Sequence, residues 1–525
     1  MTDAAPPRPL TIPDVLEAMA DAVGDRTFVE TLDTAYTYAQ VDERANRLAH
    51  HLLAQGIGRG DHVAVHAHNR IEWIDAFFGT LKIGAVPINI NYKYLRDELA
   101  HLYDNADCVA AVIAPDYVEV AGDLLAGLKH VLVMDESYGE AMAAASGERP
   151  EVDRSDDDHY VIYTGGTTGS PKGVVWRQAD LVRAALNAAR YGAPIESVEA
   201  LAVEAAANES PMVLMACGPL MHGGSQWIMG NALVAGQQIA YYTEPNFDAE
   251  RVLDLAAKSR TVSLAMLGDA MARPIAEAVL AEPDRWDLSG LAAISNGAAP
   301  LSLGVREEIR AAFPGKFILD SYGASESGAT GSSFDTGDGD GSARFGVTDE
   351  VQVFTPDLTP AAVGERGMLG RSGPIPLGYY KDEKKTAATF KEVDGVRWVI
   401  PGDFARREED GTVTVLGRGS VCINTGGEKV HPEEVEAVLL RHEGVFDAVV
   451  VGTPHERWGQ QVTALVHRRE GAELTEEDLI AHAHALIANY KVPKQVFFVE
   501  AVPRTPVSKV DYPAATARAV ELTGS

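Results

Sequence analysis

The sequence is poor in cysteine and in basic residues. Its three cysteines, Cys108, Cys217 and Cys422, lie far apart without the spacing of a metal site or a redox pair, so we expect small buried side chains in a reducing compartment. Lys and Arg number 45 against 76 Asp and Glu, and the formal net charge of -31 argues against binding nucleic acid or an anionic membrane surface.

The chain also lacks the segments that direct a protein into or across a membrane. Residues 1–9 carry no basic start followed by an apolar run, which is the pattern of a signal peptide. No stretch approaches the roughly 20 apolar residues that span a bilayer. We therefore expect a cytoplasmic protein without integral membrane association.

What the sequence does have is length and apolar content. Its 525 residues, 46% of them hydrophobic, are too many for one core and predict two or three domains. Thr37 and Gln40 form a capping-box pattern, which predicts the start of a helix. Strand-like runs at His62 to Ala67 and Pro87 to Asn91 flank a helical stretch around Ile71 to Leu81. This alternation predicts an α/β fold with largely parallel sheets.

The alternation continues with a strand expected at Tyr160 to Tyr163. A segment rich in Gly and Asp, Phe334 to Ser342, predicts a surface loop, and a smaller strand-rich region follows it. From Pro432 onward the pattern is that of a compact α+β unit, with a further helix expected from Thr475. The expected domains are residues 1–418 and 419–525.

The strongest local signal is a run of Gly, Thr and Ser that follows an expected strand and ends near a lysine. Glycines leave backbone N–H groups free to surround an anion, while the hydroxyls and the Lys172 ammonium add donors and charge. Pro171 precedes the lysine and no Gly-Lys-Ser/Thr is present, so the run is not a Walker P-loop. We expect it to bind phosphate; a flexible surface turn is the alternative. The run is Thr164, Gly165, Gly166, Thr167, Thr168, Gly169, Ser170, Pro171, Lys172 and Gly173.

This run resembles the phosphate loop of the acyl-adenylate-forming superfamily, which includes acyl-CoA synthetases, peptide-synthetase adenylation domains and firefly luciferase. Further stretches resemble that family's motifs in the family's order as far as Lys509, so the resemblance covers essentially the whole chain. It implies a large N-terminal α/β region of several subdomains and a small mobile α+β domain. It also implies an enzyme that joins a carboxylic acid to AMP from ATP and passes the acyl group to coenzyme A.

Two stretches resemble the segments that hold adenine and magnesium in this family. By that resemblance Tyr322 stacks on adenine, Ser325 contacts the α-phosphate and Glu326 binds Mg²⁺. The family usually has Thr where Ser325 stands, and Ser keeps the hydroxyl. Taken alone, Glu326 would be an ordinary solvated carboxylate. The stretches are Asn296, Gly297, Ala298, Ala299 and Pro300, and then Ser321, Tyr322, Gly323, Ala324, Ser325 and Glu326.

The resemblance also assigns the ribose site and the mobile domain. Asp403, in a Gly-Asp pair that is otherwise a common turn, is expected to accept hydrogen bonds from the ribose hydroxyls. Arg418 is expected to add a ribose or phosphate contact, and Ser420 to be the pivot, where the family often has Asp or Lys. Gly427 belongs to a Gly-Gly loop expected to enter the active site during thioester formation. Lys509 belongs to a motif whose lysine reaches the substrate carboxylate and the α-phosphate.

The expected start of the acid pocket, Pro219 to Trp227, holds no carboxylate to pair with an amine, so an α-amino acid is not the expected substrate. By resemblance His222 and Trp227 gate or line the acyl channel, and Gly223 and Gly224 leave room for bulk. A structural role for His222 is the alternative. The segment Gly417 to Glu436 looks most like that of actinobacterial acyl-CoA ligases for fatty, steroid side-chain or terpenoid acids.

Free coenzyme A is the expected acceptor, since no carrier-protein domain follows Ser525. Two alternatives stay open: an acyl-AMP ligase that loads a carrier protein, and a catalytically silent relative that binds ligand as a sensor. The expected partners are a carboxylic acid, ATP and coenzyme A, with Mg²⁺ as cofactor. A homodimer is considered as the assembly.

Overall fold

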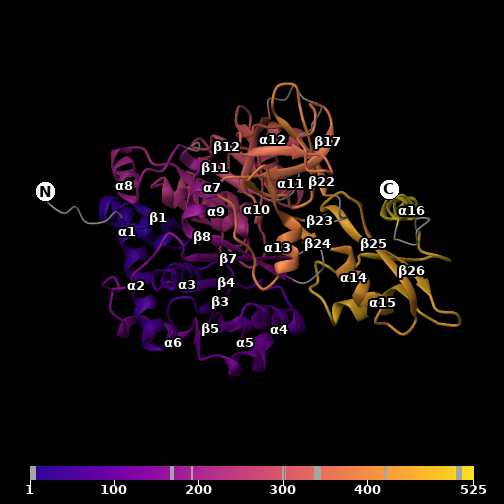
Figure 1. Ribbon diagram of the computed structural model, residues 1–525, viewed down its shortest axis with the longest axis horizontal. Helices are drawn as coiled ribbons and strands as arrows, with labels where there is room; N and C mark the ends of the chain where they lie inside the picture. The colour runs from indigo at the N-terminus through magenta and orange to yellow at the C-terminus, as the bar shows by residue number, and fades with distance from the viewer. Residues whose placement is uncertain are drawn as a thin grey trace.

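The structure is a computed structural model that describes residues 8–165, 171–190, 193–297, 301, 303–335, 344–418, 422–503 and 511–524. These residues form five β-sheets with helices around them (Figure 1). We call residues 8–418 the N-terminal part and residues 422–524 the C-terminal part, which is the smaller body at the right of Figure 1. Among the described helices, none has the length and apolarity needed to cross a bilayer.

A four-stranded sheet of the N-terminal part is parallel throughout, in the order β4-β3-β5-β6. The predicted capping box is present, because Thr37 and Gln40 cap helix α2 (Tyr38–Ala54). Helix α3 (Ile71–Lys82) connects β3 to β4, as predicted. The strands of this sheet are β3 (His62–His66), β4 (Val86–Asn89), β5 (Cys108–Ile113) and β6 (His130–Val133).

The large sheet is parallel in its centre and antiparallel at both edges, in the order β14-β13-β12-β11-β9-β10-β1-β2. The carboxyl ends of β11, β12 and β13 adjoin, and ligands bind at such ends in open α/β sheets. The strands are β1 (Thr27–Glu30), β2 (Ala35–Thr37), β9 (Val213–Ala216), β10 (Gln238–Tyr241), β11 (Ser263–Met266), β12 (Ala293–Asn296), β13 (Phe317–Ala324) and β14 (Gly328–Asp335).

One predicted strand lies in a different kind of sheet from the one expected. Tyr160 to Tyr163 belongs to β7 (His159–Gly165), which pairs antiparallel with β8 (Pro171–Arg177), and β8 pairs antiparallel with β18 (Gly378–Tyr379). The expectation of a parallel strand here is wrong, because residues 166–170 are too few for the crossover that parallel neighbours need. The glycine-rich run thus connects two antiparallel strands.

The predicted strand-rich region forms a sheet in the order β15-β22-β21-β17-β20-β19, with β16 paired to β17. The predicted loop from Phe334 is wrong at its start, because Phe334 and Asp335 still pair with β13 as the end of β14. The remainder of that loop lies outside the described residues. The strands are β15 (Arg344–Phe345), β16 (Val351–Phe354), β17 (Arg366–Arg371), β19 (Phe390–Val393), β20 (Val396–Val399), β21 (Asp403–Arg407) and β22 (Val413–Arg418).

The C-terminal part has an apolar core of its own, formed by helices α14 (Pro432–Leu439) and α15 (Glu476–His484) on a sheet. The helix starts predicted at Pro432 and Thr475 are confirmed. The predicted domain boundary adjoins residues 419–421, which are outside the described chain, and stays a prediction. The other elements are β23 (Ile423–Thr425), β24 (Glu428–Val430), β25 (Val445–His455), β26 (Gly459–Arg468), β27 (Gln495–Phe498) and α16 (Tyr512–Thr523).

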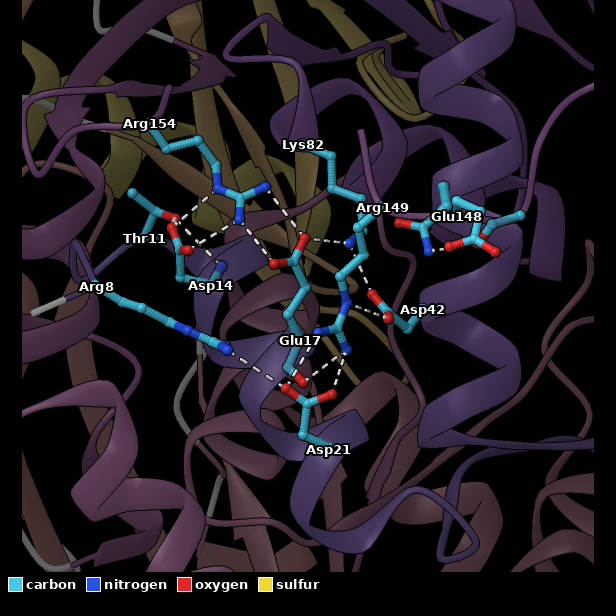
Figure 2. Close-up of polar contacts among 12 residues, drawn as sticks. Arg8, Thr11, Asp14, Glu17, Asp21, Asp42, Lys82, Glu148, Arg149 and Arg154 are labelled. Atoms are coloured by element: carbon cyan, nitrogen blue, oxygen red, sulfur yellow. Dashed lines mark hydrogen bonds and ion pairs between the residues drawn. The ribbon is translucent and has the colours of Figure 1, made fainter. Parts of the chain in front are cut away.

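A buried network of charges ties the first helices to the segment that leads into β7 (Figure 2). Lys82, fully buried on α3, donates to Glu17 of α1 (Ile12–Val23) and to Asp42 of α2, both at 2.6 Å. Arg154 binds Glu17 at 2.7 Å and Asp14 at 2.9 Å. Burial alone would raise the pKa of Glu17, but Lys82 and Arg154 outweigh it and lower that pKa. The network therefore anchors the start of the hairpin that carries the glycine-rich run.

Candidate active site

Lys172 lies on β8 opposite Thr164 of β7, so both ends of the glycine-rich run are held together. Its Nζ donates to Asp382 Oδ2 at 2.6 Å. Asp382 also accepts from the backbone N–H of Lys385 and caps helix α13 (Glu383–Thr389). The hydrogen bond from Lys172 lowers the pKa of Asp382, so the carboxylate stays ionised. An ammonium group is thus fixed beside the expected phosphate loop.

The segment from Ser321 to Glu326 forms the end of strand β13 and the two residues after it, and it is held against the same hairpin. Trp176 of β8 donates its indole N–H to the carbonyl of Ser325 at 2.9 Å. Tyr379 of β18 donates its hydroxyl to Glu326 Oε1 at 2.9 Å. The expected α-phosphate residue and the expected metal ligand are therefore both fixed to the sheet that carries Lys172.

The two expected adenine segments adjoin. A Cβ built on Gly297, just after β12, would lie 3.7 Å from the Ser321 carbonyl oxygen. The ring of Tyr322 packs on Phe345, with 5.4 Å between the ring centres. Gly323 must be glycine, because a Cβ there would lie 2.5 Å from the carbonyl oxygen of Gly328 on the paired strand. Ala324 is the last residue of β13.

Helix α9 (Gly223–Val234) brings the expected acid-pocket residues to the same place. A Cβ built on Gly223 would lie 3.8 Å from Ser325 Oγ and 3.8 Å from Trp227 Cε2. At Gly224 it would meet no atom within 4 Å. The Ser325 hydroxyl, the start of α9 and the Trp227 ring therefore converge beside open space.

The Gly-Gly loop of the C-terminal part reaches this region as well. Gly426 and Gly427 have φ angles of 58° and 85°, a conformation that favours glycine. A Cβ on Gly427 would lie 3.1 Å from Leu267 Cβ of the N-terminal part. The loop therefore packs on the N-terminal part with no room for a larger side chain.

Glu428, the next residue, is held between two basic side chains of the N-terminal part. Its Oε2 lies 3.5 Å from His222 Nε2, and its Oε1 accepts from Lys93 Nζ at 2.8 Å. Burial alone would raise the pKa of Glu428, but His222 and Lys93 outweigh it and hold that pKa far below its ordinary value. An ionised carboxylate from the C-terminal part thus reaches the start of α9.

A cavity of about 110 Å³ lies between the two parts of the chain. It reaches from the surface to the start of α9. Its lining includes Tyr92, Lys93 and His222 from the N-terminal part, and Gly426, Gly427 and Glu428 from the C-terminal part.

Other expected residues stay predictions. Asp403 is buried at the start of β21 and pairs with Arg418 of β22, whose side chain is not described. Gly165 is the last residue of β7, and its contact with phosphate is likewise untested. Some expected site residues lie outside the described part of the chain: Gly166, Thr167, Thr168, Gly169, Ala298, Ala299, Pro300, Ser420 and Lys509.

Sequence reasoning missed Asp382, Tyr379 and Lys93, and it gave no role to Glu428. The Lys172 to Asp382 contact joins residues 210 positions apart, and no local pattern signals such a pair. Glu428 follows the two glycines directly, and a charged residue next to a loop expected to enter the active site could have indicated a role for it.

Comparison with known proteins identifies the family of the chain. A family model described as AMP-binding enzyme matches residues 16–380, and one described as AMP-binding enzyme C-terminal domain matches residues 434–509. The chain is 42% identical to a medium/long-chain-fatty-acid/3-oxocholest-4-en-26-oate CoA ligase of Mycobacterium marinum, over 96% of this chain and 95% of that protein. It is 40% identical to the 3-oxocholest-4-en-26-oate CoA ligase of Rhodococcus rhodochrous, over 96% of this chain and 95% of that protein.

Among solved structures, the amide bond synthetase McbA of Marinactinospora thermotolerans matches with a TM-score of 0.81 at 24% identity, covering 96% of this chain and 99% of that chain. This likeness confirms the predicted α/β fold with its α+β C-terminal region. Since one family model spans more than half of the sequence and the relatives match almost end to end, the chain belongs to the AMP-binding enzyme family.

Proposed function

We propose that the protein is an ATP-dependent, AMP-forming acyl-CoA ligase for a bulky, largely apolar carboxylic acid. The observation that carries the proposal is the convergence at the start of α9. The Ser325 hydroxyl, from the expected nucleotide segment, and Gly427, from the C-terminal part, both lie beside this helix end. A site for adenylation and a path for a thiol therefore meet at one place.

The proposed class of acid rests on the open space at α9 and on the named relatives. Gly224 is exposed and a Cβ there meets nothing within 4 Å, so this position sets no limit on the width of the substrate. The relatives from Mycobacterium marinum and Rhodococcus rhodochrous are named as ligases for fatty or 3-oxocholest-4-en-26-oate acids. We place the acid of this protein in the same range of size and polarity.

In the first half-reaction an oxygen of the carboxylate attacks the α-phosphorus of ATP, a P–O bond forms and pyrophosphate leaves. Such a displacement needs positioning and charge neutralisation more than covalent catalysis. Lys172 supplies a fixed positive charge beside the phosphate loop, and Lys509 is assigned the contact with the carboxylate and the α-phosphate.

The residues present fit Mg²⁺ as the cofactor. Mg²⁺ is usually held by one or two carboxylates together with phosphate oxygens and water. Glu326 offers one half-buried carboxylate that Tyr379 orients. In the described residues no group of three or more His, Cys, Asp or Glu side chains could hold a metal ion. When bound, it would neutralise charge on the phosphates.

In the second half-reaction the thiol of coenzyme A loses its proton, its sulfur attacks the acyl carbon, the C–S bond forms and AMP leaves. The cavity beside His222 gives a thin pantetheine chain a path from solvent to the start of α9. Gly426 and Gly427 line this path, and Trp458 and Leu267 approach them too closely for any side chain there.

The test is a product analysis with acetate, octanoate, palmitate and a steroid side-chain acid, each with and without coenzyme A. We expect AMP, pyrophosphate and acyl-CoA, with coenzyme A required for turnover. ADP with an acyl phosphate would contradict the proposal. An acyl-AMP that coenzyme A does not discharge would instead favour the carrier-protein alternative, and no pyrophosphate with any acid would favour the silent relative.

The pivot at Ser420, a homodimer and a cytoplasmic location stay predictions. Light scattering on the purified protein measures directly whether it is a homodimer.

A further inference from the structure

The C-terminal part docks on helix α4 (Arg96–Asn105) of the N-terminal part through the segment around Lys491. Ala488 is fully buried in the same apolar cluster as Leu99 and Leu102 of α4. The Lys491 Nζ lies 4.8 Å from the centre of the Tyr94 ring. The two parts thus meet here in a packed interface.

Lys491 bridges carboxylates of both parts. Its Nζ donates to Glu98 Oε1 of α4 and to Glu434 Oε1 of α14, both at 2.7 Å, and its side chain is only 4% exposed. Glu98 is itself held, because its Oε2 accepts from the backbone N–H of Leu95 at 3.0 Å. Burial alone would lower the pKa of Lys491, but its neighbours outweigh it and raise that pKa, so the ammonium stays charged.

This cluster is connected to the cavity through two short stretches of chain. On the N-terminal part, Lys93 lies just before α4 and Glu98 lies in its first turn. On the C-terminal part, Glu428 begins β24 and Glu434 lies in the first turn of α14. The Lys93 to Glu428 pair and the Lys491 cluster therefore join the same two stretches. With both ends tied, the Gly427 loop keeps its place against Leu267.

We propose that Lys491 is a positioning residue for thioester formation, which holds the C-terminal part in the orientation that places Gly427 and Glu428 on the cavity. The proposal rests on the ligase function proposed above. The proposal assigns adenylation to Lys509, which lies beyond Lys491 in the chain, and makes it independent of this docked interface. Loss of the Lys491 charge should therefore slow one half-reaction and spare the other.

The experiment compares Lys491→Met with Lys494→Met in the full chain. Lys494 lies in the same segment, is exposed and donates only to the carbonyl oxygen of Asn489 among the described residues. Adenylation is followed by pyrophosphate exchange, and thioester formation by single-turnover transfer from a preformed acyl-AMP to coenzyme A. Removing one member of a buried ion cluster leaves unpaired charges, so we expect Lys491→Met to slow transfer by about tenfold to a hundredfold with exchange unchanged.

Lys494→Met should leave both half-reactions unchanged, and Lys491→Arg should restore most of the transfer rate. An equal loss of both half-reactions in Lys491→Met, or no loss of transfer, would overturn the positioning role. If Lys491→Met does not fold, Glu98→Gln takes its place, since glutamine keeps an acceptor for the Leu95 N–H and removes only the charge.

A second measurement separates this proposal from the ligase function. Hydrogen exchange of the backbone around Gly427 and Glu428 should rise in Lys491→Met and not in Lys494→Met, whether or not any acid is converted. If hydrogen exchange is faster in Lys491→Met and the unaltered protein makes no acyl-CoA, the ligase function fails while the docking role stands. Unchanged hydrogen exchange in Lys491→Met would overturn the docking role itself.

Discussion

His222, at the N-cap of helix α9, lies 3.5 Å from Glu428 of the C-terminal part. The residue expected to gate the acyl channel is thus paired with the residue that follows the Gly-Gly loop. Lys93 holds the other oxygen of the same carboxylate at 2.8 Å. The His222 side chain and the C-terminal part are therefore linked through one charged group.

Replacing Glu428 with Gln should slow thioester formation by about tenfold and leave pyrophosphate exchange nearly unchanged. The amide keeps the shape but loses the attraction to Lys93 and His222, and a charged hydrogen bond is worth about 1.5–3 kcal/mol. Single-turnover assays of both half-reactions measure the effect. Glu443→Gln, an exposed residue of the same part, is the control. A loss confined to pyrophosphate exchange would contradict the prediction.

Gly427→Ala should impair transfer to coenzyme A through steric contact as well as backbone strain. The new Cβ would lie 3.1 Å from Leu267 Cβ at a φ of 85°. Gly471→Ala separates the two causes, because Gly471 has a φ of 78° and no atom within 4 Å of its Cβ position. We expect transfer to fall at least about tenfold in the first variant only, with strain of about 1 kcal/mol common to both. Equal transfer rates in the two variants would show that the contact with Leu267 is without effect.

Lys172→Met should reduce adenylation by about a hundredfold to a thousandfold, the scale for losing one charge-stabilising group in an active site. Transfer from a supplied acyl-AMP should persist, because pyrophosphate has already left. Lys384→Met, an exposed lysine on helix α13 close to Asp382, is the matched control. Pyrophosphate exchange at the unaltered rate in Lys172→Met would rule out a role in adenylation.

Gly224→Trp should selectively damage large acids. The site faces open space beside the expected acyl channel, so an indole there would take room that a bulky substrate needs. We expect kcat/KM for palmitate or a steroid acid to fall at least about tenfold, while acetate changes little. The same substitution at Gly139, an exposed glycine with open space on helix α6 (Glu136–Ala144), controls for the added ring. Acetate as the best substrate of the unaltered protein would refute the size argument.

Local patterns predicted local structure. The capping box at Thr37, the proline at the start of α14 and the cap at Thr475 are each decided by a few neighbouring residues, and all are present. The same reasoning failed for β7, whose pairing depends on the short connection to β8. Alternation of strands and helices along the chain does not say which strand pairs with which.

The same difference between local patterns and long-range contacts applies to the candidate site. Motifs indicated Lys172, Glu326 and Gly427, whose roles stay predictions. They did not indicate Asp382 or Tyr379, because partners far apart in the sequence are brought together only by the fold. These missed residues orient the ones that were named.

The buried network around Lys82 yields a prediction on stability. Glu17 binds Lys82 at 2.6 Å and Arg154 at 2.7 Å, so Glu17→Gln should leave buried charges without their partner and cost about 3 kcal/mol of unfolding free energy. The same change at Glu43, which is exposed and pairs only with Arg47 among the described residues, should cost less than about 1 kcal/mol. Thermal unfolding of both variants at neutral pH makes the comparison.

The dependence of stability on pH gives a second test of the same network. Despite burial, Lys82 and Arg154 lower the pKa of Glu17 in the folded protein, so the unfolded chain takes up the proton first as the pH falls. The stability that Glu17 contributes is then fully present above its unfolded pKa of about 4.3 and is lost as the pH falls through the lower folded pKa. The stability difference between the unaltered protein and Glu17→Gln should therefore narrow on acidification below that range. A difference that stays constant from neutral pH down to acid unfolding would mean that Glu17 contributes through packing and not through its charge.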